Sequence, residues 1–255
     1  MRMSRVFITG ASSGIGAALA LVYARRGARL GLVGRNPDRL EALRAALPGT
    51  HDIYALDVRD RTALHSAARD FLEGGPVDVV VASAGISAGT LTEELDDFRV
   101  FEAIMATNLN ATVATFEPFV ASMKQQGRGT LVGVSSVAAV RGLPGAGAYS
   151  ASKAAVRNYC ESLRVELRPS GVKVVTLAPG FVRTPMTAQN PYKMPFLMPV
   201  EAFAEQAVQA IDRGVSYKVI PWQMAWVARL LRCVPNRVYD YFAVRRKRKP
   251  RAPSV

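Results

Sequence analysis

The chain alternates short, continuously apolar runs with longer stretches in which apolar residues recur every three or four positions. The short runs are rich in Val, Ile and Leu and predict buried strands at residues 5–9, 30–33, 51–56, 77–82, 130–134, 172–177 and 217–220. The longer stretches predict amphipathic helices that begin near residues 15, 38, 60, 94, 149, 200 and 222. Alternating strands and helices predict an α/β fold: a doubly wound parallel sheet with helices on both faces and right-handed crossovers.

The first predicted strand runs directly into a glycine-rich turn and then into a helix. The turn reads Thr9-Gly10-Ala11-Ser12-Ser13-Gly14-Ile15-Gly16. Free N–H groups and the dipole at a helix N-terminus attract a phosphate, and glycines let it approach the backbone. The spacing G-x-x-x-G-x-G is not the G-x-G-x-x-G fingerprint, and glycines also mark ordinary turns. Its place between a first strand and a helix favours a Rossmann-type dinucleotide-binding loop.

The second predicted strand ends at Gly34-Arg35-Asn36-Pro37. A carboxylate at this point would hold the ribose hydroxyls of NAD, whereas a guanidinium can bind the 2′-phosphate of NADP. Arg35 therefore favours NADP(H) over NAD(H) as the cofactor. The alternative is that Arg35 is a solvated arginine in a loop.

Several polar or small residues follow the other predicted strands. In a parallel sheet, ligands bind outside the carboxyl ends of the strands. We therefore expect one crevice to be lined by residues that each follow a strand, namely Gly10, Asp57, Gly85, Ser136 and Pro179.

Tyr149 and Lys153 lie four residues apart in a predicted helix, so their side chains share one face. An ammonium group near a phenol favours the phenolate and lowers its pKa from about 10, toward the range useful for proton transfer at neutral pH. Ser136 can hydrogen-bond a substrate oxygen at the same place. Taken alone, Tyr-x-x-x-Lys is also an ordinary helical turn with a solvated lysine. Its convergence with the strand ends favours a catalytic site.

Together these motifs resemble the short-chain dehydrogenase/reductase family, in its smaller single-domain branch, over roughly residues 4–220. The turn Gly10–Gly16 resembles its cofactor loop, Asp57-Val58 its adenine-contacting pair, and Pro179-Gly180 with Thr184 the loop that seats the nicotinamide. The resemblance implies the following cofactor-binding residues: Gly10, Ser12, Ser13, Gly14, Ile15, Gly16, Arg35, Asp57, Val58, Ala84, Gly85, Asn108, Tyr149, Lys153, Pro179, Gly180, Val182 and Thr184.

The resemblance also implies an oxidoreductase that transfers a hydride between NADP(H) and a carbonyl or alcohol substrate. Its catalytic residues would be Asn108, Ser136, Tyr149 and Lys153. Ser136 would polarise the carbonyl, and Tyr149 would protonate its oxygen. Lys153 would lower the pKa of Tyr149 and hold the nicotinamide ribose, while Asn108 would fix a water that connects Lys153 to solvent. A homodimer or homotetramer is implied, through the predicted helices at 94–126 and 149–167.

Residues 185–199 contain four prolines among Met, Phe and Leu side chains. Proline at this density predicts a loop, which with the following helix would form a substrate lid over residues 184–213. The apolar side chains favour an apolar or lipid-like carbonyl substrate, although they could simply cap the core. The alternatives are a reductase of 3-oxoacyl thioesters or long-chain keto lipids at a membrane surface, and a non-catalytic NADP-binding regulatory protein. The intact Ser136, Tyr149 and Lys153 argue against the latter.

The net charge of +13 is concentrated at the C-terminus, where residues 245–251 carry six positive charges and no acid. No zinc-ligand spacing or aromatic-rich basic platform points to nucleic acid. We divide the chain into a dinucleotide-binding and catalytic domain at 1–221 and, at 222–255, an apolar helix with a basic tail. The Trp, Leu and Arg residues of 222–234 fit a helix at an anionic membrane surface. They fit equally a helix that packs on the protein, followed by a disordered tail.

Length and composition fit one globular domain, because 255 residues with 49% hydrophobic content can form a sizeable core. Two cysteines, Cys160 and Cys233, are too few for a disulfide framework or a metal cluster, so no metal is expected. The sequence shows neither a signal peptide nor an apolar run of membrane-spanning length. We therefore expect a cytoplasmic protein, with peripheral membrane contact as the further option.

Overall fold

A computed structural model of the chain describes residues 3–245 and 247–251. Its centre is a parallel sheet of seven strands in the order β3-β2-β1-β4-β5-β6-β7. The strands are β1 (Arg5–Thr9), β2 (Arg29–Gly34), β3 (Asp52–Ala55), β4 (Val79–Ala82), β5 (Gly129–Val134), β6 (Val172–Pro179) and β7 (Tyr217–Ile220). From β1 the chain first proceeds outward to β3, and then from β4 outward to β7. The predicted doubly wound sheet is therefore confirmed, with its switch point between β1 and β4.

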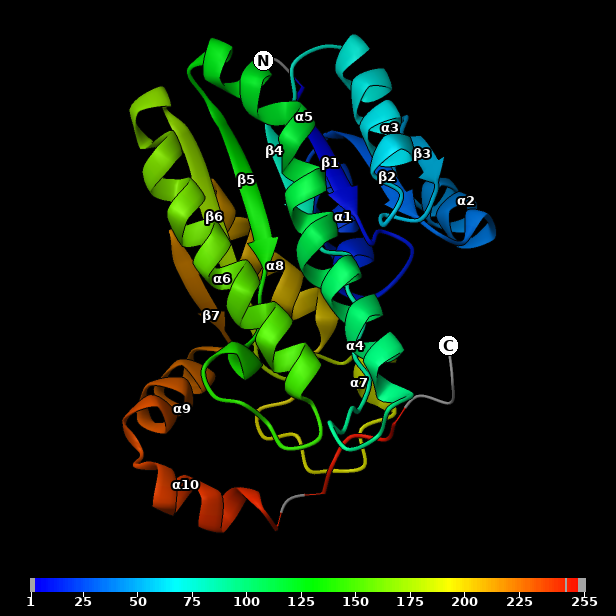
Figure 1. The fold of residues 1–255 in the computed structure, drawn as a ribbon. Helices are drawn as coiled ribbons and strands as arrows, with labels where there is room; N and C mark the ends of the chain where they lie inside the picture. The colour runs from blue at the N-terminus through cyan, green and yellow to red at the C-terminus, as the bar shows by residue number, and fades with distance from the viewer. Residues whose placement is uncertain (1–2, 246, 252–255) are drawn as a thin grey trace.

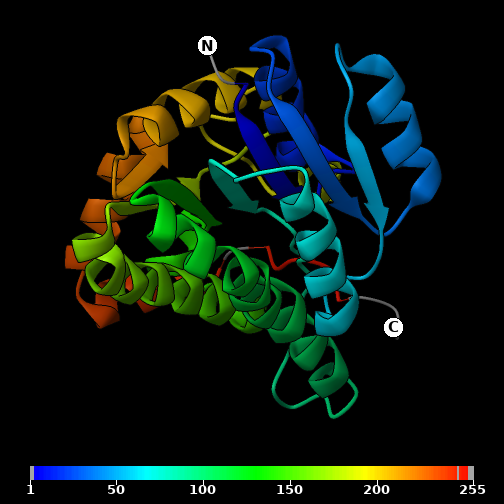
Figure 2. The ribbon, with the colours of Figure 1, turned by 90° about the horizontal axis from the view of Figure 1, so that it is seen from above.

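Helices cover both faces of the sheet (Figures 1 and 2). On one face, α1 (Gly14–Arg25) packs against α8 (Val200–Arg213), and Leu19 and Phe203 are fully buried there. On the other face lie α3 (Arg61–Glu73), α5 (Ala111–Gln126) and α6 (Gly147–Leu167). The remaining helices are α2 (Pro37–Ala46), α4 (Asp97–Met105), α7 (Pro185–Ala188), α9 (Trp222–Cys233) and α10 (Asn236–Ala243). The strands read as continuous apolar runs because both faces of the sheet are covered.

Two predicted segments differ from the structure in detail. The long helical region at 94–126 is divided by a π-helical turn, η1 (Ala106–Asn110), into α4 and α5. Such turns insert an extra residue into a helix and are frequent at functional sites. The segment 185–199 is largely irregular, as predicted, and contains only the short helix α7.

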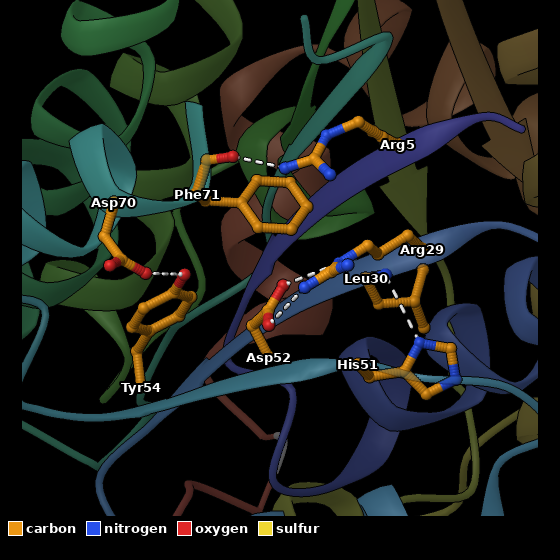
Figure 3. A network of polar contacts seen from close by, with 8 residues as sticks. All are labelled: Arg5, Arg29, Leu30, His51, Asp52, Tyr54, Asp70 and Phe71. Carbon is orange, nitrogen blue, oxygen red and sulfur yellow. Dashed lines mark hydrogen bonds and ion pairs between the residues drawn. The ribbon is translucent and has the colours of Figure 1, made fainter. Parts of the chain in front are cut away.

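Polar contacts fix the amino ends of the outer strands (Figure 3). Arg29 of β2 donates from Nε and Nη2 to the two carboxylate oxygens of Asp52 in β3, at 3.0 and 2.9 Å. The buried imidazole of His51 accepts the N–H of Leu30 at 3.3 Å. Arg5 at the start of β1 belongs to the same network, where its guanidinium lies over the ring of Phe71. These contacts lie at the amino ends of the strands, so they stabilise the sheet and leave its carboxyl ends free for ligands.

The C-terminal segment packs on the protein in part. Helix α9 contacts β7 and the 3-10 turn η2 (Val137–Ala139). The guanidinium of Arg141 donates to the carbonyl oxygens of Leu231 and Val234 at 3.1 and 2.8 Å, and it lies 4.2 Å from the ring centre of Tyr239 in α10. The predicted helix at 222–234 is confirmed. Within residues 3–245 and 247–251, none of the helices combines the length and apolarity needed to cross a membrane.

Candidate active site

A cavity opens at the carboxyl ends of the strands around the switch point. Every residue predicted to bind cofactor or to act in catalysis lines it, except Asn108. The sequence reasoning missed further lining residues that no motif marks, among them Leu56, Ile86, Thr107 and Val134. Leu56 and Ile86 closely follow β3 and β4, so the rule that ligands bind where strands end could have found them.

The glycine loop forms the inner end of the cavity. Gly10 and Gly14 have φ angles of 69° and 56°, in the left-handed region that favours glycine. A Cβ at Gly10 would lie 2.7 Å from the backbone nitrogen of Ala84, and one at Gly16 would overlap the carbonyl oxygen of Gly10. The first turn of α1 carries no acidic residue. This arrangement fits the pyrophosphate of a dinucleotide, because it leaves the backbone N–H groups at the start of α1 open to an anion.

A positively charged corner lies where β2 and β3 end. Arg35 lines the cavity, and its side chain is exposed. Asp57 accepts hydrogen bonds from Arg59, with Nη2 at 2.7 Å, and this pair lowers the pKa of the carboxyl; Arg35 contributes further to the lowering. Arg59 pairs with the carboxylate and Arg35 lies near it, so two guanidinium groups share one carboxylate and the corner keeps a net positive charge. It fits a phosphate group better than a pair of neutral hydroxyls.

Ser136, Tyr149 and Lys153 converge in the middle of the cavity. Helix α6 presents Tyr149 and Lys153 on one face, with the Lys153 Nζ 5.9 Å from the centre of the Tyr149 ring. Ser136 follows β5, and its hydroxyl hydrogen-bonds the Tyr149 phenol. The hydroxyls of Ser136 and Tyr149 and the ammonium of Lys153 are therefore available to a ligand bound in the cavity.

Burial is the largest influence on the pKa values of Tyr149 and Lys153. It raises the pKa of Tyr149, against the lowering effect of the Ser136 hydrogen bond, and nearby Tyr192 adds to the rise. Burial also lowers the pKa of Lys153 to about 8. The structure does not show the predicted lowering of the Tyr149 pKa by Lys153, because the Lys153 Nζ donates instead to the carbonyl oxygen of Val134 at 2.9 Å. Tyr149 is therefore protonated at neutral pH, which is the form that a proton donor needs.

Asn108 lies behind the cavity wall, fully buried in the π-helical turn η1. Its Oδ1 accepts the N–H of Ile86 at 2.8 Å, and its Nδ2 donates to the Ile86 carbonyl at 3.0 Å and to Ser152 Oγ at 2.9 Å. A Cβ at Gly85 would lie 3.2 Å from Asn108 Oδ1 and 3.3 Å from Lys153 Nζ, so the two groups are neighbours. The amide ties the loop after β4 to α6, and the predicted contact with a water stays a prediction.

The segment predicted to form a substrate lid borders the outer end of the cavity. Pro185, Met186 and Thr187 line it. Tyr192, which belongs to the predicted substrate lid, packs with its ring centre 6.4 Å from that of Phe181 and raises the pKa of Tyr149. Nothing in its proline-rich surroundings distinguishes Tyr192 by sequence, because only the fold of the loop brings it to the active site.

Comparisons with known proteins agree with this architecture. Residues 4–194 match the family model described as short chain dehydrogenase. An uncharacterized oxidoreductase of Myxococcus xanthus is 42% identical over 250 residues, which are 96% of this chain and 98% of that protein. A crystal structure of a short-chain dehydrogenase from Streptomyces avermitilis has a TM-score of 0.83 at 25% identity, covering 96% of this chain and 97% of the other. A short-chain dehydrogenase from Sphingobium yanoikuyae in complex with NADPH has a TM-score of 0.78 at 27% identity, covering 92% and 97%.

Proposed function

This chain belongs to the short-chain dehydrogenase family, and it is accordingly an NAD(P)-dependent oxidoreductase; we propose that it is an NADPH-dependent carbonyl reductase acting on an apolar or lipid-like substrate. The observation that carries the proposal is the convergence of Ser136, Tyr149 and Lys153 in a cavity whose inner end is the glycine loop. A non-catalytic NADP-binding protein is the alternative. It would need the loop but not these three side chains.

The proposed chemistry follows from the protonation states of the three side chains. When bound, the nicotinamide supplies the hydride. The Ser136 hydroxyl holds the substrate oxygen, and the protonated Tyr149 donates a proton to it; in the opposite direction the phenolate accepts one. Lys153, whose Nζ lies 5.9 Å from the centre of the Tyr149 ring, would hold the ribose hydroxyls of the nicotinamide.

The proposed substrate preference rests on the outer end of the cavity. Met186 lines the cavity there with Pro185, and Met can adapt to ligands of different shape. A reductase of 3-oxoacyl thioesters or long-chain keto lipids is the more specific alternative. It would use the same three catalytic groups.

NADP(H) is proposed over NAD(H) because the corner formed by Arg35, Asp57 and Arg59 carries net positive charge. The Sphingobium yanoikuyae relative was solved with NADPH, which supports the same choice.

Replacing Arg35 with alanine is expected to lower the affinity for NADPH about 10- to 100-fold, the usual range for losing hydrogen bonds to a charged group. The affinity for NADH should change little, because NADH has no 2′-phosphate. Titration calorimetry with each cofactor measures both values. Arg69→Ala, an exposed arginine on α3 away from the cavity, is the matched control. An unchanged preference for NADPH in Arg35→Ala would remove Arg35 from the site.

We also propose a homodimer or homotetramer through the helices at 94–126 and 149–167. Leu95 and Phe98 are 90% and 62% exposed at the start of this region, and Val165 of α6 is 59% exposed. Large exposed apolar side chains on neighbouring helices fit a contact between subunits. Sedimentation velocity distinguishes a monomer from these assemblies.

A peripheral contact with an anionic membrane is a second proposal, carried by the outer face of α9. Trp222, Trp226 and Leu230 recur every four residues and are 64%, 62% and 68% exposed. Arg229 and Arg232 are exposed on the same helix. Aromatic and apolar side chains beside arginines fit the interface of an anionic bilayer. We propose a cytoplasmic location as well, because both cysteines are free and Cys233 is exposed, as is usual in a reducing compartment.

The double variant Trp222→Ser/Trp226→Ser is expected to bind phosphatidylserine vesicles at least about ten-fold more weakly than the original chain, because burying each indole contributes on the order of 1.5–3 kcal/mol. Co-sedimentation with these vesicles and with phosphatidylcholine vesicles measures the effect. Phe98→Ser/Phe101→Ser removes two partly exposed aromatics from α4 and serves as the control. Equal vesicle binding by both double variants would assign the α9 face to another partner.

A further inference from the structure

Part of the basic tail, which one of the two alternatives above treated as disordered, packs on the protein. Residues 247–251, here called the strap, cross the carboxyl end of the sheet between α10 and α4 (Figure 1). The N–H of Gly89 donates to the carbonyl oxygen of Pro250 at 2.9 Å. A Cβ at Gly89 would lie 2.8 Å from this oxygen and would overlap the carbonyl oxygen of Lys249. The strap therefore lies directly on the loop that follows β4.

Charge complementarity anchors the end of the strap. The Nε of Arg251 donates to both carboxylate oxygens of Asp97, at 3.2 and 3.0 Å, and its Nη2 lies 3.1 Å from Glu94. The Asp97 carboxylate is buried and also accepts the N–H of Leu91 at 2.8 Å. The guanidinium of Arg251 thus pairs with two carboxylates through different nitrogens, and these charge-assisted contacts define the position of the strap.

The strap spans the loop that follows β4 and the loop between β5 and α6, and both loops continue from residues that line the cavity. On one side it contacts Ser87 and Gly89, which follow Ile86 of the cavity wall. On the other side the Arg248 side chain packs against Gly145, in the loop between β5 and α6. Ser136 and Tyr149 flank this second loop. The strap thus connects two loops that each adjoin residues of the cavity wall.

Lys249 differs from Arg251 in its partners. Its Nζ donates to the Ser87 hydroxyl at 2.8 Å, and no carboxylate pairs with it among residues 3–245 and 247–251. The side chain is partly buried, and this burial lowers its pKa. A partly buried ammonium without a counter-charge is unfavourable, and an anionic ligand beside it would relieve the cost.

We propose that the strap closes the substrate end of the cavity and that Lys249 binds an anionic group of the substrate, at the far end from the reacting carbonyl. The substrate would then be an amphiphile: an apolar chain with a carbonyl group toward Ser136 and Tyr149, and an anionic terminus at Lys249. This inference rests on the proposed function of the cavity as a carbonyl-reducing site.

Binding of octanoate and octanol to the protein saturated with NADP⁺, measured by calorimetry, tests the proposal without requiring turnover. The original chain is expected to bind octanoate at least ten-fold more tightly than octanol. Lys249→Gln should lose this ten-fold preference and leave the octanol affinity unchanged. Lys247→Gln, an exposed lysine of the same strap, is the matched control and should change neither affinity.

Three results would overturn the proposal: no octanoate binding by the original chain, no preference for octanoate, or an equal effect of Lys249→Gln on both probes. Kinetics with 7-oxooctanoate and its methyl ester separate this failure from failure of the proposed function. If octanoate binds as expected but neither ketone is reduced, the proposed carbonyl reduction is contradicted and the proposed role of Lys249 is not. If both ketones are reduced and their KM values respond equally to Lys249→Gln, the proposed role of Lys249 in the strap is contradicted and the proposed carbonyl reduction is not.

Discussion

Replacing Tyr149 with phenylalanine is expected to lower the rate of carbonyl reduction about 10³-fold and to leave the affinity for NADPH within a factor of about two. Phenylalanine keeps the ring but removes the hydroxyl that hydrogen-bonds Ser136 and that would donate the proton to the substrate oxygen. General acid catalysis contributes about 10²- to 10⁴-fold in enzymes, so the loss falls within this range. The decay of NADPH absorbance measures turnover, and calorimetry measures cofactor affinity.

The matched control is Tyr159→Phe, nearly three turns further along α6 and outside the cavity. Tyr159 stacks on Phe116 and is likewise partly buried, which raises its pKa to about 12. Removal of the Tyr159 hydroxyl should therefore lower the stability of the protein somewhat and leave its activity unchanged. If Tyr149→Phe kept more than a tenth of the original turnover, another group would have to supply the proton.

Gly16→Ala is expected to lower the affinity for NADPH at least about 100-fold. The added Cβ would overlap the carbonyl oxygen of Gly10 and approach its carbonyl carbon at 2.7 Å, so the backbone of the loop must move. Overpacking of this kind costs about 1–3 kcal/mol. The displacement also disturbs the N–H groups that would hold the pyrophosphate, so binding should fall further than stability.

Gly142→Ala is the control for this substitution, because a Cβ there meets no atom within 4 Å. Thermal unfolding followed by circular dichroism checks that Gly16→Ala still folds cooperatively. A folded Gly16→Ala variant with unchanged NADPH affinity would show that the glycine loop is not the phosphate site.

Features that depend on local periodicity could be predicted from the sequence. The strands of a sheet covered on both faces read as unbroken apolar runs, and the order of strands and helices then permits few topologies. Tyr149 and Lys153 share a helical face because a turn contains 3.6 residues. Ser136 and Gly85 reach the same cavity because parallel strands end at the same edge.

Features that depend on the exact placement of two distant segments could not be predicted. Asn108 lies behind the cavity wall because the backbone of Ile86 holds its amide, and the single π-helical turn that places it there has no periodic signature in the sequence. The partner of Lys153 is a backbone carbonyl, which carries no sequence signature. The contacts of the tail could not be predicted because its composition resembles a disordered segment, whereas its anchor is Asp97 and Glu94, more than 150 residues away.

The position of the strap also decides how this protein should be produced. The chain enters the sheet at Arg5, at the end of β1 opposite to the cavity, so an affinity tag fused before Met1 stays far from the ligand (Figure 1). A tag fused after Val255 would begin only four residues beyond Arg251 and its contact with Asp97. Inhibitor screening and crystallisation are therefore best carried out with N-terminal fusions.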